Sequence, residues 1–241
     1  MNAIILLAQR ELKTYLNTAW GWTVMAGVLL VVGLLFNVFG LSERPRYSAE
    51  VLEDFFFYTS GTIIIAGLLL TMRLIAEERQ TGTLVVLESA PISAAQVVAG
   101  KFLGAWGFLM CIVASTVYMP ALIFINGKVS VAQMGVGYLG LALAGSAAIS
   151  IGTFASAISR NQLLAAVLGG AMALLIVICW LLSGLTEAPL ADILAYMAMW
   201  DKHFQPFMRG RLNTENVVYF GSLSFIFLLG ATRALQARRW Q

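Results

Sequence analysis

The chain has 241 residues, of which 60% are hydrophobic and 11% are charged, and its formal net charge is +3. A soluble domain carries about 25% charged residues, so a water-soluble fold of this size could not bury so much apolar side chain, and lipid must be the solvent for much of the chain. The weak positive balance, without a long basic run, excludes nucleic acid as a partner and fits a membrane protein with basic rims.

The long apolar runs predict an all-α fold, a polytopic membrane helix bundle in the lipid bilayer. A helix needs roughly 20 apolar residues to cross a bilayer, and these runs lack the alternation of barrel strands. We expect a single transmembrane domain over residues 1–241, with six spans at 20–41, 55–76, 102–125, 131–158, 163–182 and 217–235.

Residues 1–18 predict a helix that lies in the membrane surface before the first span. Apolar residues such as Ile4 and Leu7 recur beside polar ones that include Arg10 and Lys13, which is typical of an interfacial helix. The alternative is a simple extension of the first span. A cleavable signal is not expected, because the basic residues follow the apolar ones instead of preceding them.

Residues 77–100 form the longest connection on the predicted cytoplasmic side. Its sequence predicts a charged end of span two, a turn at Thr81–Gly82–Thr83, a short amphipathic helix, a break at Ala90–Pro91, and a new helix capped by Ser93. A charged amphipathic helix that projects from a bundle is typical of a docking element for a soluble partner. An ordinary solvated linker is the alternative.

The basic residues of the connections favour both termini in the cytoplasm. On this topology the basic residues of the inner side are Arg10, Lys13, Arg73, Arg79, Lys101, Arg160, Arg233, Arg238 and Arg239. Residues 183–213 then form an extracytoplasmic segment. Its apolar residues recur near helical spacing after Pro189, so we expect one or two short helices that dip into the outer leaflet, and a loop over residues 42–54.

Small residues are spaced for close helix packing in lipid. Gly100 and Gly104 form one small-xxx-small pair, Gly152 and Ser156 form another, and Gly169 adjoins Gly170. Such residues let helix backbones approach one another, so they predict a packed bundle and offer a face for a homodimer.

No catalytic constellation is visible, so we expect no enzymatic activity and no cofactor. There is no phosphate-binding loop and no nucleophile motif around a serine, and the single histidine, His203, adjoins Asp201 and Lys202. The predicted spans contain almost no ionisable residues, which argues against ion-coupled transport. Cys111 and Cys179 lie in apolar runs and are interpreted as packing residues.

Copper binding is one alternative for the outer segment, where Met197, Met199, His203 and Met208 lie close in sequence. Thioethers suit soft copper ions. Methionines are scattered along the whole apolar chain, however, and packing is the interpretation that we favour, so no metal site is expected.

Two regions resemble a known family. The stretch Glu-Glu-Arg-Gln-Thr-Gly-Thr-Leu at residues 77–84, followed by Ala90–Pro91 and by Gly-Lys-Phe at 100–102, resembles the permease subunits of type 2 ABC transporters. Within them, the gliding-motility-type permeases are the most similar on the residues of the last third of the chain: His203–Phe204, Phe207, Arg209–Gly210, the run 217–220 and Arg238–Arg239–Trp240.

The resemblance implies the permease of an ATP-driven exporter in a bacterial inner membrane. Such permeases pair as a homodimer or with a related permease, bind a soluble ABC ATPase subunit, and can have an auxiliary protein. The implied ATPase-coupling residues are Glu77, Glu78, Arg79, Thr81, Gly82, Thr83, Leu84 and Leu87. Glu77 and Glu78 would meet basic residues of the ATPase, and the surface helix with Arg10 and Lys13 would also contact it.

The extracytoplasmic gate implied by the resemblance consists of His203, Phe204, Arg209 and Gly210. A competing hypothesis is a membrane anchor or assembly scaffold that holds a soluble partner without transport, for which the same docking segment would serve. An intramembrane enzyme would need a buried nucleophile or a metal site, which the sequence does not offer.

Overall fold

The computed structural model describes residues 3–40, 47–83, 91–126 and 130–238. Six helices in these ranges are long and apolar enough to cross a membrane, so the predicted six-span helix bundle is confirmed. Their cores are α2 (Ala19–Leu35), α3 (Ser48–Thr71), α6 (Ala94–Ser115), α8 (Val131–Ile158), α9 (Gln162–Ser183) and α12 (Thr214–Arg238). The π-helical turn η1 (Phe36–Gly40) continues α2.

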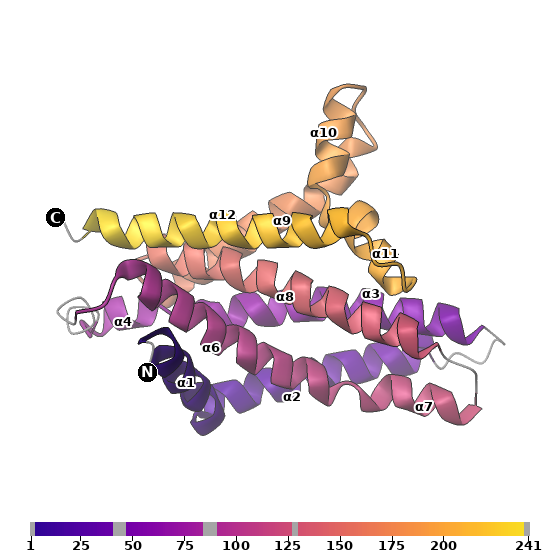
Figure 1. Cartoon of the computed structure of the whole chain (residues 1–241), viewed down its shortest axis with the longest axis horizontal. Coiled ribbons are helices and arrows are strands. Elements are labelled where there is room, and N and C mark those ends of the chain that lie inside the picture. The colour runs from indigo at the N-terminus through magenta and orange to yellow at the C-terminus, as the bar shows by residue number, and fades with distance from the viewer. Residues whose placement is uncertain (1–2, 41–46, 84–90, 127–129, 239–241) are drawn as a thin grey trace.

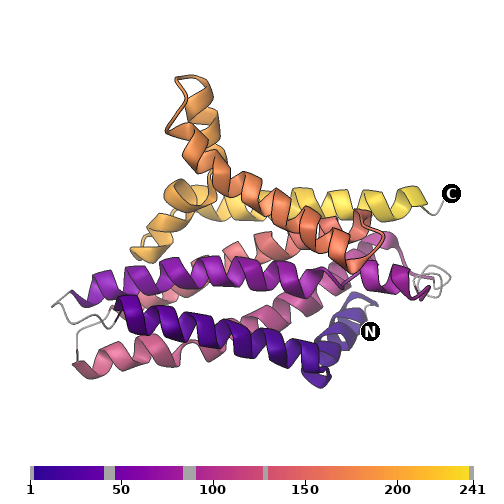
Figure 2. The same cartoon turned by 180° about the vertical axis from the view of Figure 1, so that it is seen from behind.

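Shorter helices lie at the two ends of this bundle: α1 (Ala3–Asn17), α4 (Ala76–Gln80), α7 (Tyr118–Asn126), α10 (Leu190–Met197), η2 (Met199–Phe204) and α11 (Gln205–Met208). Both ends of the chain lie at the same end of the bundle, together with α1 and α4 (Figure 1). At the other end α10 packs against α9 and projects away from the other long helices, which is visible from both sides (Figures 1 and 2).

The first helix is separate from the first span. Thr18 has extended backbone angles, φ −104° and ψ 144°, and interrupts the hydrogen bonding between α1 and α2. The interpretation of residues 1–18 as a simple extension of the first span is therefore wrong. α1 turns back onto α6, where a Cβ on Gly100 would lie 2.6 Å from the Cβ of Leu7 and one on Gly104 would lie 2.5 Å from that of Glu11.

Two predicted boundaries need correction. The expected loop over 42–54 is wrong for its second half, because α3 begins at Ser48. Val51 and Leu52 are buried in the core, and Glu50 lies in the first turn, where an acidic side chain stabilises a helix. The expected third span divides into α6 and α7, since Pro120 lacks the N–H that would bond the carbonyl of Thr116.

The described residues form two hydrophobic clusters, one along most of the bundle and one at the end that carries α1 and α4. The larger cluster is rich in aromatic rings, including Phe55, Phe56 and Phe207. The smaller one joins four helices and the residue before α4 through Leu7, Ile75, Ala94, Val97, Val98, Ala157, Ala231 and Leu235. The end of the bundle with both termini is thus packed as a unit of its own.

The small-residue pairs lie at contacts between helices of this chain. Gly100 and Gly104 are buried against α1, and Gly152 is buried against α3, where an added Cβ would lie 1.8 Å from Oγ1 of Thr71. Ser156 is also buried. The expected homodimer face is therefore wrong at these four residues, because this chain's own helices cover them. Gly170 differs, since a Cβ there would meet nothing within 4 Å.

Gly152→Ala tests the packing of α8 on α3. The added methyl group has no room beside Thr71, and overpacking of this kind destabilises by roughly 1–3 kcal/mol. We expect the thermal unfolding midpoint in detergent to fall by roughly 5 °C. Gly170→Ala is the matched control, since a Cβ there meets nothing within 4 Å. Equal midpoints for the two variants would contradict this packing.

Candidate functional site

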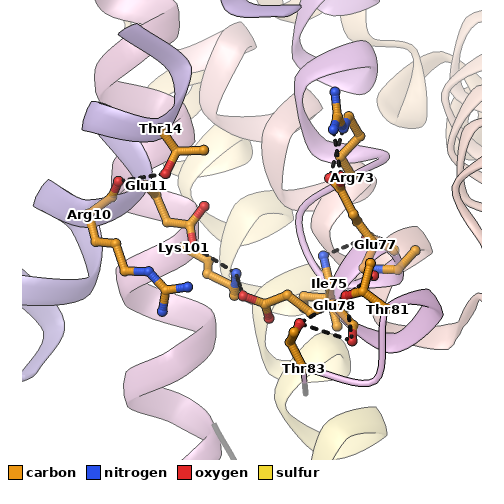
Figure 3. A network of polar contacts seen from close by, with 12 residues as sticks. Arg10, Glu11, Thr14, Arg73, Ile75, Glu77, Glu78, Thr81, Thr83 and Lys101 are labelled. Atoms are coloured by element: carbon orange, nitrogen blue, oxygen red, sulfur yellow. Dashed lines mark hydrogen bonds and ion pairs between the residues drawn. The ribbon is translucent and has the colours of Figure 1, made fainter. Parts of the chain in front are cut away.

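A buried ammonium group organises the end of the bundle that carries α1 and α4. Lys101, in the second turn of α6, is 1% exposed, and its Nζ lies 2.8 Å from Oε1 of Glu11 and 2.8 Å from Oε1 of Glu78. The two carboxylates come from α1 and α4, so one cation joins three helices (Figure 3). A buried charge requires such partners, because an unpaired ion in an apolar interior is strongly unfavourable.

The start of α4 is fixed on α8 by a serine. Oγ of Ser156 accepts hydrogen bonds from the backbone N–H of Ile75, at 3.0 Å, and of Ala76, at 2.9 Å. These N–H groups open the short helix and would otherwise be unsatisfied in a buried position. The sequence itself predicted Ser156 only as a small packing residue.

Arg79 joins the other end of α4 to α8. Its guanidinium donates hydrogen bonds to the backbone carbonyls of Ser159 and Ala157, where α8 ends at Ile158. A cation at a helix C-terminus is favoured by the partial negative charge of the last carbonyls. Arg79 was predicted as an ATPase-coupling residue, and in the described structure it stabilises the packing of α4 on the end of α8.

A second ion pair joins Arg73, which follows α3, to Glu77 of α4. Arg73 donates to both carboxylate oxygens of Glu77, with Nε 2.7 Å from Oε2, and its guanidinium lies over the ring of Trp20 at 5.6 Å. The hydroxyl of Tyr15 donates to the carbonyl of Leu70 at 2.8 Å, and burial raises the pKa of this hydroxyl. These contacts join α1 and α2 to the end of α3.

The predicted turn after α4 is present. Gly82 has φ +73°, a conformation that favours glycine, and a Cβ there would meet nothing within 4 Å. Thr81 Oγ1 donates to the carbonyl of Glu77 at 2.9 Å and lies 3.0 Å from Oγ1 of Thr83. All three residues of the turn are exposed, so the turn presents a short ordered polar surface.

The predicted coupling residues therefore separate into three groups. Thr81, Gly82 and Thr83 are exposed, whereas Glu77 and Glu78 have ion-pair partners within the chain. Leu84 and Leu87 lie outside the described residues, as does the predicted short amphipathic helix that contains them. After them, the predicted cap at Ser93 is confirmed, with a reciprocal capping box between Ser93 and Gln96.

A cavity of about 330 Å³, lined mainly by charged and polar residues, opens between α1 and α4. Arg10 and Glu11 line it from α1, and Glu78 and Thr83 line it from the other side. One carboxylate oxygen of Glu78, Oε2, is buried without a hydrogen-bond partner among the described residues. Arg10 and Lys13 are exposed on α1, beside this opening.

The residues predicted as an outer gate anchor the outer segment on the bundle. His203 is fully buried, with its ring 3.7 Å from that of Tyr219, and its two nitrogens lie 2.9 Å from the carbonyl of Tyr196 and 3.1 Å from Oδ1 of Asn216. Phe204 is buried in the larger cluster. Both histidine nitrogens have protein partners, so this arrangement leaves neither for the copper site considered above.

Two further gate residues hold the same segment. Nε of Arg209 donates to Oε1 of Glu53 at 2.9 Å, which joins the segment to the start of α3. Gly210 has φ +73° and passes close to Gln133 of α8, where a Cβ would lie 2.9 Å from the Cα of Gln133. Among the described residues no group of three or more His, Cys, Asp or Glu side chains could hold a metal ion.

The chain matches the family model described as ABC-2 family transporter protein over residues 7–214, and it belongs to this family. A search of the curated proteins found no match. The predicted resemblance to type 2 ABC permeases is thereby confirmed. The chain is a multi-pass membrane permease of the ABC transporter class, and permeases of this family are non-catalytic components that generally pair with an ABC ATPase subunit.

Lys101→Met tests the central ion cluster. The substitution leaves two mostly buried carboxylates without their cation, which destabilises by about 3 kcal/mol. The thermal midpoint should fall clearly, and adding Glu11→Gln and Glu78→Gln should recover most of the loss, because no unpaired charge stays buried.

Lys202→Met is the control for this substitution. Lys202 lies 4.0 Å from Glu215, with both side chains about half exposed, and such a pair contributes at most about 1 kcal/mol. A midpoint for Lys101→Met as high as that for Lys202→Met would show that the buried cluster does not hold these helices together.

Proposed function

We propose that this chain is the permease subunit of an ATP-driven exporter of the gliding-motility type, and that a soluble ATPase docks at the end formed by α1, α4 and the turn at residues 81–83. The observation that carries the proposal is the Lys101 cluster. It ties the two peripheral helices α1 and α4 to the spanning helix α6 through bonds of 2.8 Å. A force applied to the docking end thus reaches the spans directly.

The docking surface of this proposal consists of exposed residues. Thr81 and Thr83 project from an ordered turn, and Arg10 and Lys13 lie on the exposed side of α1. The basic pair would meet acidic side chains of the ATPase. Glu78 and Arg79 act inside the permease in this account, since their partners Lys101, Ser159 and Ala157 belong to the chain itself.

The orientation in the proposal places the docking end in the cytoplasm of a bacterial inner membrane. Both ends of the chain lie at this end of the bundle (Figure 1). Basic residues of the predicted inner connections gather there, including Arg10, Arg73 and Lys101. A cytoplasmic excess of basic residues is the usual signature of the inner side.

Two copies of the permease would form the pathway. α9 and α12 are the least buried of the six spans, and α9 supports a shared surface because only Ala165 and Gly169 of this helix are buried. Leu163, Leu175 and Leu181 of α9 are each more than half exposed, and none of the residues of α10 is buried. A second copy and lipid together would cover these faces.

Gly82→Val tests docking without disturbing the bundle. A β-branched residue disfavours φ +73° by about 1–2 kcal/mol, so the turn would leave its docking conformation, while the open surroundings avoid a clash. We expect roughly tenfold weaker binding of the separately encoded ATPase to the purified permease, at an unchanged thermal midpoint. Gly221→Val is the control, since a Cβ there also meets nothing within 4 Å.

Normal ATPase binding by Gly82→Val would contradict the docking role of this turn. A measurement of substrate flux distinguishes the exporter from the scaffold hypothesis. Liposomes that contain both subunits should move a substrate only with hydrolysable ATP, whereas a scaffold would bind the ATPase and move nothing.

A further inference from the structure

A mostly apolar cavity of about 270 Å³ lies in the half of the bundle away from Lys101, where α9 and η2 meet α3. Phe57 of α3, Ile176 and Trp180 of α9, and Trp200 and Asp201 of η2 line it. This volume is near the lower limit of small-molecule pockets, which hold roughly 300–1,000 Å³. Three aromatic rings and a single carboxylate thus face one small space.

Contacts within the chain hold the aromatic side chains Phe57 and Trp200 of the cavity in place without a ligand. The indole Nε1 of Trp200 donates to Oγ of Ser60 at 2.9 Å, and the ring of Trp200 lies 6.3 Å from that of Phe57. The indole also packs beside Gly61, where a Cβ would lie at an ordinary contact distance of 3.6 Å from Cζ2 of Trp200. Trp180 is 52% exposed and forms the open side.

Asp201 has no ion-pair partner among the residues that the structure describes. The neighbouring Lys202 points elsewhere, with its ammonium 4.3 Å from the ring of Tyr196 and 4.0 Å from Glu215. Asp201 is exposed at the rim of the cavity, and partial burial of its carboxyl raises the pKa of this group above the ordinary value. The carboxylate of Asp201 can therefore bind the cationic group of a ligand.

The position of the cavity selects ligands that dissolve in the membrane. Trp180 lies in the last turn of α9, which ends at Ser183, and tryptophans at span ends occupy the border between lipid and water. Ile176 lies one turn deeper in α9 than Trp180. The polar end of the cavity therefore faces the headgroup level, and its apolar end faces the acyl chains.

We propose that this cavity binds a cationic amphiphile, an alkylammonium compound with its head between Trp180, Trp200 and Asp201. The faces of the two indoles attract an ammonium group, and the carboxylate adds charge complementarity. The alkyl chain lies along Phe57 and Ile176. Anionic amphiphiles are repelled by Asp201, and uncharged ones gain only the apolar contacts. The inference concerns binding by the chain itself and does not depend on ATPase coupling.

The test is a binding titration of the full chain in neutral maltoside micelles with dodecyltrimethylammonium, followed by tryptophan fluorescence. Dodecanol and dodecyl sulfate are the uncharged and anionic comparison ligands. We expect Asp201→Asn and Trp180→Leu each to weaken dodecyltrimethylammonium binding by about five- to tenfold. Binding of dodecanol should be unchanged in Asp201→Asn.

Asp192→Asn is the matched control, because Asp192 is an exposed carboxylate of α10 outside the cavity. It should bind dodecyltrimethylammonium as the unmodified chain does. Equal affinities of the unmodified chain and Asp201→Asn would overturn the proposal, as would an equal loss in Asp192→Asn, preference for dodecyl sulfate, or no binding at all. Thermal midpoints of the variants separate loss of binding from loss of folding.

Discussion

The buried charge of Lys101 is the constraint on which the rest of the inner end depends. An ammonium that is 1% exposed among apolar helix ends is tolerated only beside carboxylates, since taking an ion out of water is unfavourable by several kcal/mol. Glu11 must therefore stay with α6 and hold α1 in place, and Glu78 must do the same for α4. Gly100 and Gly104 permit this arrangement, because α1 passes where their side chains would be. One cation thus converts three separate segments into one unit.

This unit gives the proposed coupling a physical route. α4 is bonded to α8 by Ser156 at its start and by Arg79 at its end, so the turn that follows it is not a loose loop. In the proposed coupling, movement of that turn would displace α6 and α8 together. The outer segment is anchored separately, by His203 on α12 and by Arg209 on α3. In a bundle that is fixed at both ends in this way, a partner protein can move the spans. Charged residues in the middle of the spans are then not needed.

Local patterns predicted what depends on local physics. The bilayer thickness sets the length of the apolar runs, so six spans followed from hydropathy, and the turn at Gly82 and the cap at Ser93 followed from backbone preferences. The Lys101 cluster could not be predicted in this way, since its partners lie 90 and 23 residues away in sequence. From the sequence, Glu78 resembled an exposed docking residue and Lys101 a solvated rim residue. The helical start of α3 was missed because its stabilising contacts, at Val51 and Leu52, are tertiary.

The most direct test of this account is a distance measurement across the unit. Spin labels at Thr14→Cys on α1 and Gln80→Cys at the end of α4, with Cys111 and Cys179 replaced by alanine, report whether the two segments move together. In the complex with its ATPase, the account predicts one narrow distance distribution that is the same with and without ATP, and a broad one after Lys101→Met. A distance that shifts on ATP binding while Lys101 is intact would contradict it.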